Sequence, residues 1–123
     1  MFNVGLIVSE CSGCVIVALH GELDIADAAD VAAALAAAAA GRTEIVVDLA
    51  GLTFIDCSGV RSLAQAQARY EGGLMFLAAP RRVVLRVIAM TGLIDIGDVC
   101  ATVEDAVDMA HRVAVANRLS RAR

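Results

Sequence analysis

The sequence predicts an α/β domain with a mixed, mainly parallel sheet of about four to five strands and about four packed helices. Two observations support this fold class. Short apolar runs with the two-residue period of strands alternate with longer segments that have the 3.6-residue period of helices. Their order, β-β-α-β-α-β-α-β-α, is typical of a parallel sheet with an antiparallel hairpin at one edge. A length of 123 residues suits one domain, which we expect to span 1–123 with its core at about 4–117.

The composition restricts the classes of function. The chain is 59% hydrophobic but only 3% aromatic, so its core must be built from Val, Leu, Ile and Ala. A net charge of −4 argues against direct binding of nucleic acid, which needs clustered basic residues. The longest apolar run, 31–40, is far shorter than the roughly 20 residues of a membrane span. The N-terminus lacks the basic segment of a signal peptide, so we expect a cytoplasmic protein with reduced cysteines and no membrane contact.

The first two strands are predicted at residues 4–9 and 14–20, joined by a hairpin turn. Gly13 lies at the tip, where a tight turn needs the positive φ that glycine adopts readily. Cys11 and Cys14 have CxxC spacing and are candidates for a redox pair. A hairpin lacks the helix N-terminus that activates such pairs, and one CxxC is only half of a zinc site. We therefore favour a plain turn over a functional thiol pair.

The middle of the chain continues this alternation. A helix is expected over 26–40, with Gly41 as its C-cap. The apolar segment 44–50 predicts a buried strand, and 52–55 continues extended. The chain then turns at Asp-Cys-Ser-Gly into an amphipathic helix over 59–70.

The last part of the chain repeats the pattern. The second helix should end at 71–73, and 74–79 should form another buried strand. Pro80 suits the start of a third helix that runs to Met90 and closes at Gly92.

A weak final strand is expected at 94–99. The segment Thr-Val-Glu-Asp at 102–105 resembles a capping box that opens a last helix, which we expect to end near Asn117. Residues 118–123 then form a basic tail that we expect to fray.

The tripeptide Cys-Ser-Gly occurs twice, and only the second copy follows a strand and precedes a helix. In parallel sheets, functional sites gather at the carboxyl ends of the strands, where the helices begin. We expect Ser58 to be the N-cap of the second helix, its hydroxyl accepting a backbone N–H of the first turn. A helix N-terminus also attracts anions, so it would hold a phosphate on Ser58. This phosphate would change the charge beside Asp56 by about −1.5 to −2.

Catalytic patterns are missing around this junction. A cysteine-phosphatase loop needs C-x5-R, but Leu63 occupies that position after Cys57, and no G-x-S-x-G elbow surrounds Ser58. His20 ends a strand and His111 lies in the last helix, so no catalytic triad is indicated. The sequence shows no phosphate-binding glycine loop and no cluster of metal ligands. We expect a protein that is not an enzyme and has no metal or cofactor.

Five segments in a fixed order and spacing resemble a known family. They are G-E-L-D (21–24), V-V-D-L-A-G-L-T-F-I-D-C-S-G-V (46–60), A-A-P-x-x-V (78–83), M-T-G-L-x-x-I (90–96) and T-V-E-D-A-V (102–107). Together they resemble the STAS domain of bacterial anti-sigma factor antagonists, over about residues 4–117. Each motif alone is weak, and their shared order makes the resemblance specific.

The resemblance implies a small switch protein of transcription regulation. In this family the unphosphorylated antagonist binds an anti-sigma factor, which then releases its sigma factor. The anti-sigma factor is commonly also a serine kinase that phosphorylates the antagonist, and a phosphatase resets it. The family's phosphorylated residue in D-S-[ST]-G falls on Ser58. The implied partner surface consists of Asp24, Asp56, Cys57, Ser58, Gly59, Val60 and Arg61.

Both carboxylates of this surface also have structural interpretations, because Asp24 is placed to cap the first helix and Asp56 to order the turn. Cys57 stands where the family commonly has serine, and a thiol near a helix N-terminus can be reactive. With Cys100 expected at the same end of the sheet, redox regulation through Cys57 or Cys100 is one alternative. Another keeps the fold but makes the chain a STAS-type structural subunit, for example of a transporter complex. A thiol enzyme is the third.

Overall fold

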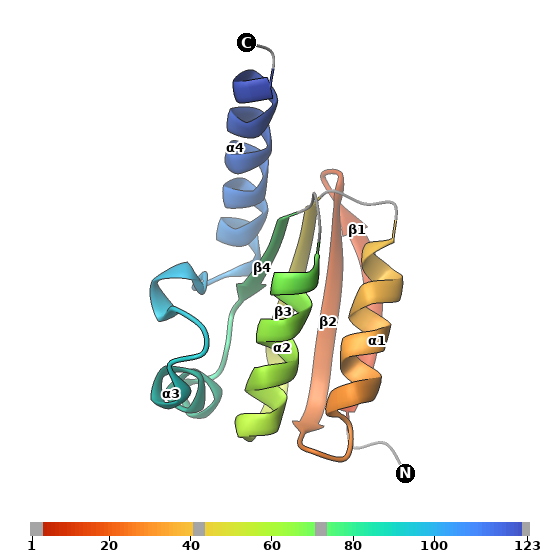
Figure 1. The fold of residues 1–123 in the computed structure, drawn as a ribbon, viewed down its shortest axis with the longest axis vertical. Coiled ribbons are helices and arrows are strands. Elements are labelled where there is room, and N and C mark those ends of the chain that lie inside the picture. Colours follow the sequence, from red (N-terminus) through yellow and green to blue (C-terminus); the bar gives the residue numbers. More distant parts are fainter. Residues whose placement is uncertain (1–3, 41–43, 71–73, 122–123) are drawn as a thin grey trace.

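The computed structural model describes residues 4–40, 44–70 and 74–121 (Figure 1). Within these ranges, four strands form one sheet in the order β1-β2-β3-β4, with β1 antiparallel to β2 and the other pairs parallel. The strands are β1 (Val4–Cys11), β2 (Cys14–Leu23), β3 (Glu44–Ile55) and β4 (Leu74–Ala78). The helices are α1 (Ala28–Ala39), α2 (Cys57–Arg69), α3 (Arg82–Thr91), α4 (Val103–Arg121) and the short 3₁₀ helix η1 (Ile96–Asp98). The predicted α/β class with a mixed sheet and four helices is confirmed.

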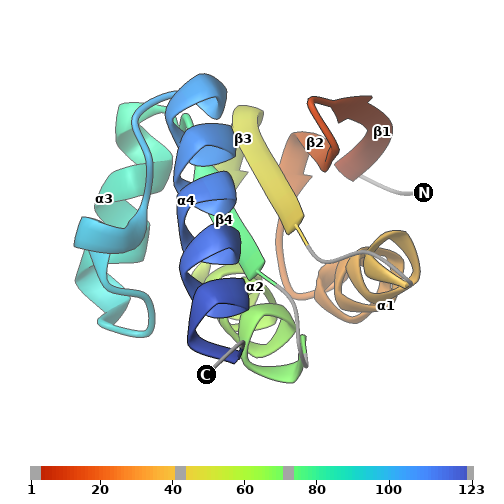
Figure 2. The same cartoon turned by 90° about the horizontal axis from the view of Figure 1, so that it is seen from above.

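The sheet separates two hydrophobic clusters. Alternate residues of β3 point to opposite faces, so Ile45 and Val47 pack in a large cluster with α1, α2 and α3, and Val46 packs in a smaller one with α4. Seen from above, α1 lies beside α2 on one side of the sheet (Figure 2). Helix α4 packs on the other face, against β3 and β4. The core expected from the composition is therefore divided into two aliphatic clusters, one on each face of the sheet.

The hairpin turn has the backbone that its sequence predicts. Gly13 has φ of 85°, and Ser12 before it also has a positive φ, 52°. Cys11 and Cys14 pair across the strands, so two residues make the loop. Positive φ at both loop positions matches the right-handed twist of a hairpin.

The predicted strand at 94–99 is wrong. Ile96–Asp98 in this segment form η1, where the Asp95 carboxylate accepts the Gly97 N–H at 2.9 Å and so closes a tight turn. Only one parallel bridge, between Ala78 and Cys100, extends the sheet at this edge within the described residues. The Asp-x-Gly turn overrides the apolar pattern because its side-chain hydrogen bond satisfies the backbone locally.

Several element ends also differ from the prediction. Helix α3 begins at Arg82 with Arg81 as N-cap, so Pro80 precedes the helix, whereas Gly92 closes it with φ of 67° as expected. Thr102 caps α4 by accepting the Asp105 N–H at 3.0 Å, as the capping box predicts. Helix α4 continues to Arg121, so residues 118–121 of the expected frayed tail are helical. The predicted helix ends at 41 and 71–73 lie outside the described residues.

Candidate functional site

The carboxyl ends of β2 and β3 are joined at the start of α2. The Asp56 N–H donates to the Leu23 carbonyl at 3.2 Å, which connects the end of β3 to the end of β2. Gly59 is buried against the same carbonyl, and a Cβ on it would lie 2.7 Å from that oxygen. The backbone that approaches Gly59 so closely therefore belongs to β2 of the same chain. As a result, the end of β2 lies against the first turn of α2.

Asp56, and not Ser58, is the N-cap of α2. Its carboxylate accepts the Gly59 N–H at 2.8 Å, and its carbonyl accepts the first helical bond from Val60 at 3.0 Å. The predicted N-cap role of Ser58 is wrong because the aspartate one position before the helix already satisfies a donor of the first turn. Ser58 is instead the second helical residue and half-buried. Its hydroxyl takes no part in the cap.

The other residues expected to contact the partner differ in how exposed they are. Cys57 and Arg61 are exposed, and Asp24 is half-buried. Gly59 and Val60 belong to the core, with Val60 fully buried, so neither is available to a partner. This corrects their assignment to the partner surface.

The two carboxylates in the loop after β2 differ from the expectation. The Asp24 carboxylate accepts the Ala26 N–H at 3.0 Å and so orders this loop, but it does not cap α1. The N-cap of α1 is Asp27, a residue that the sequence did not point to. Asp27 is buried, and its Oδ2 has no hydrogen-bond partner within the described part of the chain. A buried carboxylate oxygen without a partner destabilises the fold, so such groups often belong to functional sites.

A groove lies between α1 and α2 and reaches Ser58. It has a volume of about 930 Å³ and is lined on the α1 side by Ile25 and by alanines that include Ala32 and Ala36. Ser58 and Arg61 line it from the first turn of α2. The sequence prediction missed this groove. Its signal was the alanine run, because alanines three and four residues apart share one helix face and leave space beside a neighbouring helix.

The cysteines expected to provide redox regulation lie apart. All four cysteines are free. Cys57 begins α2 on one face of the sheet, whereas Cys100 packs into the α4 cluster on the other. Burial raises the pKa of the Cys100 thiol, and the Asp105 and Asp98 carboxylates raise it further. A raised pKa lowers the thiolate fraction at neutral pH, which argues against Cys100 as a redox sensor.

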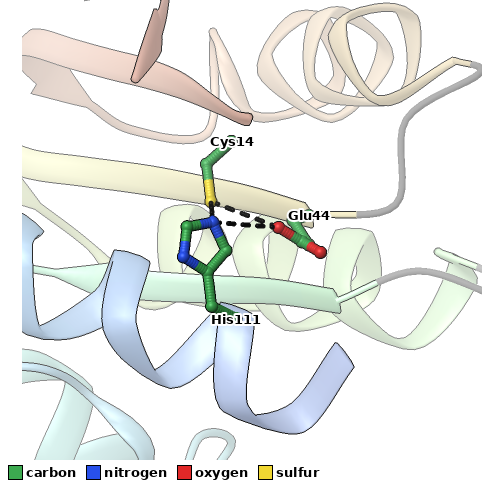
Figure 3. Close-up of side chains that lie close together, drawn as sticks. All are labelled: Cys14, Glu44 and His111. Atoms are coloured by element: carbon green, nitrogen blue, oxygen red, sulfur yellow. Dashed lines mark hydrogen bonds and ion pairs between the residues drawn. The ribbon is translucent and has the colours of Figure 1, made fainter. Parts of the chain in front are cut away.

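The structure brings together one cluster of possible metal ligands that the sequence did not indicate. Cys14, Glu44 and His111 converge on one another (Figure 3). They lie where β2 and β3 begin, whereas Ser58 follows the end of β3. Burial raises the pKa of the Cys14 thiol to about 11, with a further contribution from the Glu44 carboxylate. The expectation that the chain has no cluster of metal ligands is therefore corrected. Residues 14, 44 and 111 are so far apart in the chain that only the fold reveals them.

Within the described residues, no helix is both long and apolar enough to cross a membrane.

Comparisons with known proteins give a consistent result. The family model of the STAS domain matches residues 6–106. No curated protein matches the sequence. Among solved structures, an anti-sigma factor antagonist from Mycobacterium paratuberculosis is similar, with 24% identity, a TM-score of 0.79, and coverage of 88% of this chain and 94% of that one.

Two further similar structures are a separate antagonist and a transporter in which the match is one part of a longer chain. The anti-sigma factor antagonist SpoIIAA in its unphosphorylated form is 25% identical with a TM-score of 0.69, covering 87% of this chain and 96% of that one. The murine anion transporter Solute Carrier 26 family member A9 is 23% identical with a TM-score of 0.72, and the match covers 85% of this chain but only 18% of the transporter. The family match over most of the length, together with the observed fold, shows that the chain belongs to the STAS domain family.

Proposed function

We propose that this protein is an anti-sigma factor antagonist whose unphosphorylated form binds an anti-sigma factor, and that phosphorylation of Ser58 ends the complex. The observation that carries the proposal is the position of Ser58 in the first turn of α2, at the rim of the groove between α1 and α2. Because Asp56 already caps the helix, the Ser58 hydroxyl can be modified without loss of the cap. The similar protein SpoIIAA has been solved in unphosphorylated and phosphorylated forms, which supports this proposal.

A phosphate on Ser58 would be held locally. It would meet the positive end of the α2 dipole and the guanidinium of Arg61, which follows three residues later on the helix. It would also bring about −1.5 to −2 charges next to the Asp56 carboxylate. The fold would tolerate this change, whereas a partner surface that fits the unmodified serine would meet a bulky dianion. This difference is the physical basis of the switch.

The partner surface that we propose is formed by Asp24, Asp56, Cys57, Ser58, Arg61 and the groove between α1 and α2. The five named residues are exposed or half-buried and lie near the carboxyl ends of β2 and β3. The partner is an anti-sigma factor that is also a serine kinase, and a phosphatase regenerates the free hydroxyl. We propose a cytoplasmic location, where kinase, phosphatase and ATP are available.

A structural subunit is the second candidate. The similarity to a portion of a murine anion transporter favours it, because that fold is there one part of a much longer chain. A subunit of this kind would keep its partner whatever the state of Ser58.

The first experiment is phosphosite mapping by mass spectrometry on protein from its native cells, combined with capture of partners by wild type and variants. The expected result is one phosphoryl group on Ser58, and a partner that is retained by wild type and Ser58→Ala and lost by Ser58→Asp. Ser12→Asp is the matched control, since Ser12 is the serine of the first Cys-Ser-Gly copy, in the hairpin turn at the other end of the sheet. An unmodified Ser58 with a partner indifferent to Ser58→Asp would reject the switch and favour the subunit.

A further inference from the structure

Three side chains with metal-binding atoms converge where β2 and β3 begin. Cys14 is the first residue of β2, Glu44 the first of β3, and His111 lies in α4, which packs across this face of the sheet. The next residues on both strands, Val15 and Ile45, pair in register, so Cys14 and Glu44 start neighbouring strands side by side. Figure 3 shows the thiol, the carboxylate and the imidazole pointing toward one another.

The distances between these atoms match the edges of a coordination tetrahedron. The Cys14 Sγ lies 3.6 Å from both Glu44 Oε2 and His111 Nε2, and these two atoms are 3.4 Å apart. Zinc bonds of about 2.3 Å to sulfur and about 2.0–2.2 Å to nitrogen and oxygen place tetrahedral ligands about 3.4–3.6 Å from one another. The nitrogen–oxygen distance also exceeds the roughly 2.7–3.2 Å of a good hydrogen bond. The same three distances suit the two thiol contacts and the ion pair of the metal-free chain, so the cluster is spaced to accept one ion without a change of backbone.

The donor set selects the metal. A thiolate is a soft ligand, an imidazole is intermediate and a carboxylate is hard, and Zn²⁺ accepts all three in tetrahedral sites. Magnesium and calcium prefer oxygen ligands only. The thiol is fully buried, and the side chains of Glu44 and His111 are 13% and 39% exposed, so an ion can enter from the His111 side. A water can complete the tetrahedron.

We propose that Cys14, Glu44 and His111 bind one Zn²⁺ that fastens α4 to the amino ends of β2 and β3. On binding, the Cys14 thiol releases its proton to solvent and a sulfur–zinc bond forms, with no change of oxidation state. Because the three ligands come from separate elements, the ion stabilises the folded chain and not the unfolded one. The site lies at the opposite end of the strands from Ser58. Its test is therefore independent of the proposed switch.

The test uses the full chain, reduced and freed of metal, titrated with Zn²⁺ against a chromophoric chelator. We expect one Zn²⁺ per chain and a higher Tm when zinc is present. Substitution of Co²⁺ should give the near-ultraviolet charge-transfer band of a cobalt–thiolate bond. Cys14→Ala and His111→Asn should each weaken zinc binding at least about tenfold, since even the loss of a residue that only orients a metal ligand costs about 10–100-fold.

Matched controls separate this site from incidental binding. His20→Asn and Cys57→Ser change the other histidine and an exposed thiol away from the site, and both should bind zinc like wild type. If Cys14→Ala does not fold without metal, the zinc affinity of His111→Asn tests the proposal instead. Because the His111 side chain is partly exposed on α4, its replacement should leave the fold intact. The proposal is overturned if zinc does not raise Tm, if no cobalt–thiolate band develops, or if His111→Asn binds zinc as tightly as His20→Asn.

Discussion

The Asp56 carboxylate accepts the Gly59 backbone N–H at 2.8 Å and so caps α2, two residues before the hydroxyl of Ser58. This arrangement separates the residue that maintains the helix from the residue proposed for modification. A phosphoacceptor that was also the cap would exchange its hydroxyl cap for phosphate oxygens whenever it was phosphorylated. Here the first turn keeps its cap in either state.

The separation predicts different costs for two neighbouring substitutions. Asp56→Ala removes the cap and should lower the free energy of unfolding by about 1 kcal/mol, within the roughly 0.5–2 kcal/mol found for N-cap residues. Ser58→Ala removes a hydroxyl outside the cap and should change stability by less than about 0.5 kcal/mol. Urea denaturation of the two variants and wild type measures both values. A larger loss for Ser58→Ala would return the capping role to the serine.

Gly59→Ala should disrupt the junction between the ends of β2 and β3 and the first turn of α2. A Cβ at this position would lie 2.7 Å from the Leu23 carbonyl oxygen and 2.7 Å from Ile55 Cγ1, and backbone cannot move away as a flexible side chain can. We expect a loss of about 2 kcal/mol or more, in the range of overpacked core sites.

Gly13→Ala is the comparison for this substitution. Gly13 has φ of 85°, but a Cβ on it would meet no atom within 4 Å, so only backbone strain of about 1 kcal/mol is expected there. Thermal unfolding of both variants tests the steric argument. Equal losses at Gly59 and Gly13 would mean that contact with β2 contributes nothing.

Local patterns predicted most of the fold, and their failures have local causes. The hairpin, the parallel strands and the Thr102 cap follow from periodicity and turn chemistry over a few residues. The strand expected at 94–99 failed because the Asp95 carboxylate bonds the Gly97 N–H and closes a turn that hydropathy does not register. The Ser58 cap failed because two capping residues stand two positions apart, and a sequence does not say which one the helix uses.

The candidate sites were predictable to different degrees. The Ser58 junction was predictable because its residues are contiguous in the chain. The burial of Val60 and of Asp27 depends on which helix face meets the sheet, which is decided by tertiary packing. The meeting of Cys14 with His111 depends on how α4 crosses the sheet, and no local pattern encodes it.

Alkylation rates should distinguish Cys100 from Cys57. Burial raises the pKa of Cys100, and the nearby Asp105 and Asp98 raise it further. A raised pKa leaves less thiolate at a given pH, so Cys100 should react more slowly at pH 8 and gain reactivity only as the pH rises above the usual thiol range. Mass spectrometry after timed iodoacetamide treatment at several pH values, with the exposed Cys57 as internal reference, measures this. Cys100 reacting as fast as Cys57 at pH 8 would revive its proposed redox role.

The groove between α1 and α2 gives a prediction that links shape to partner binding. Ala36 lines this groove, whereas its neighbour Ala37 is exposed on α1 but does not line it. Ala36→Glu places a charged side chain in an apolar groove, so binding to the partner captured by wild type should weaken at least about tenfold. Ala37→Glu changes composition and helix propensity identically and should bind like wild type.

Both variants should unfold within about 0.5 kcal/mol of wild type, because each position is exposed on the surface of α1. Calorimetric titration with the captured partner then attributes any difference in affinity to the groove and not to folding. If Ala36→Glu binds the partner as well as Ala37→Glu does, the partner contacts only the α2 end around Ser58 and Arg61. The contact surface would then exclude α1, and the specificity of the complex would depend on the loop after β2 and the first turn of α2.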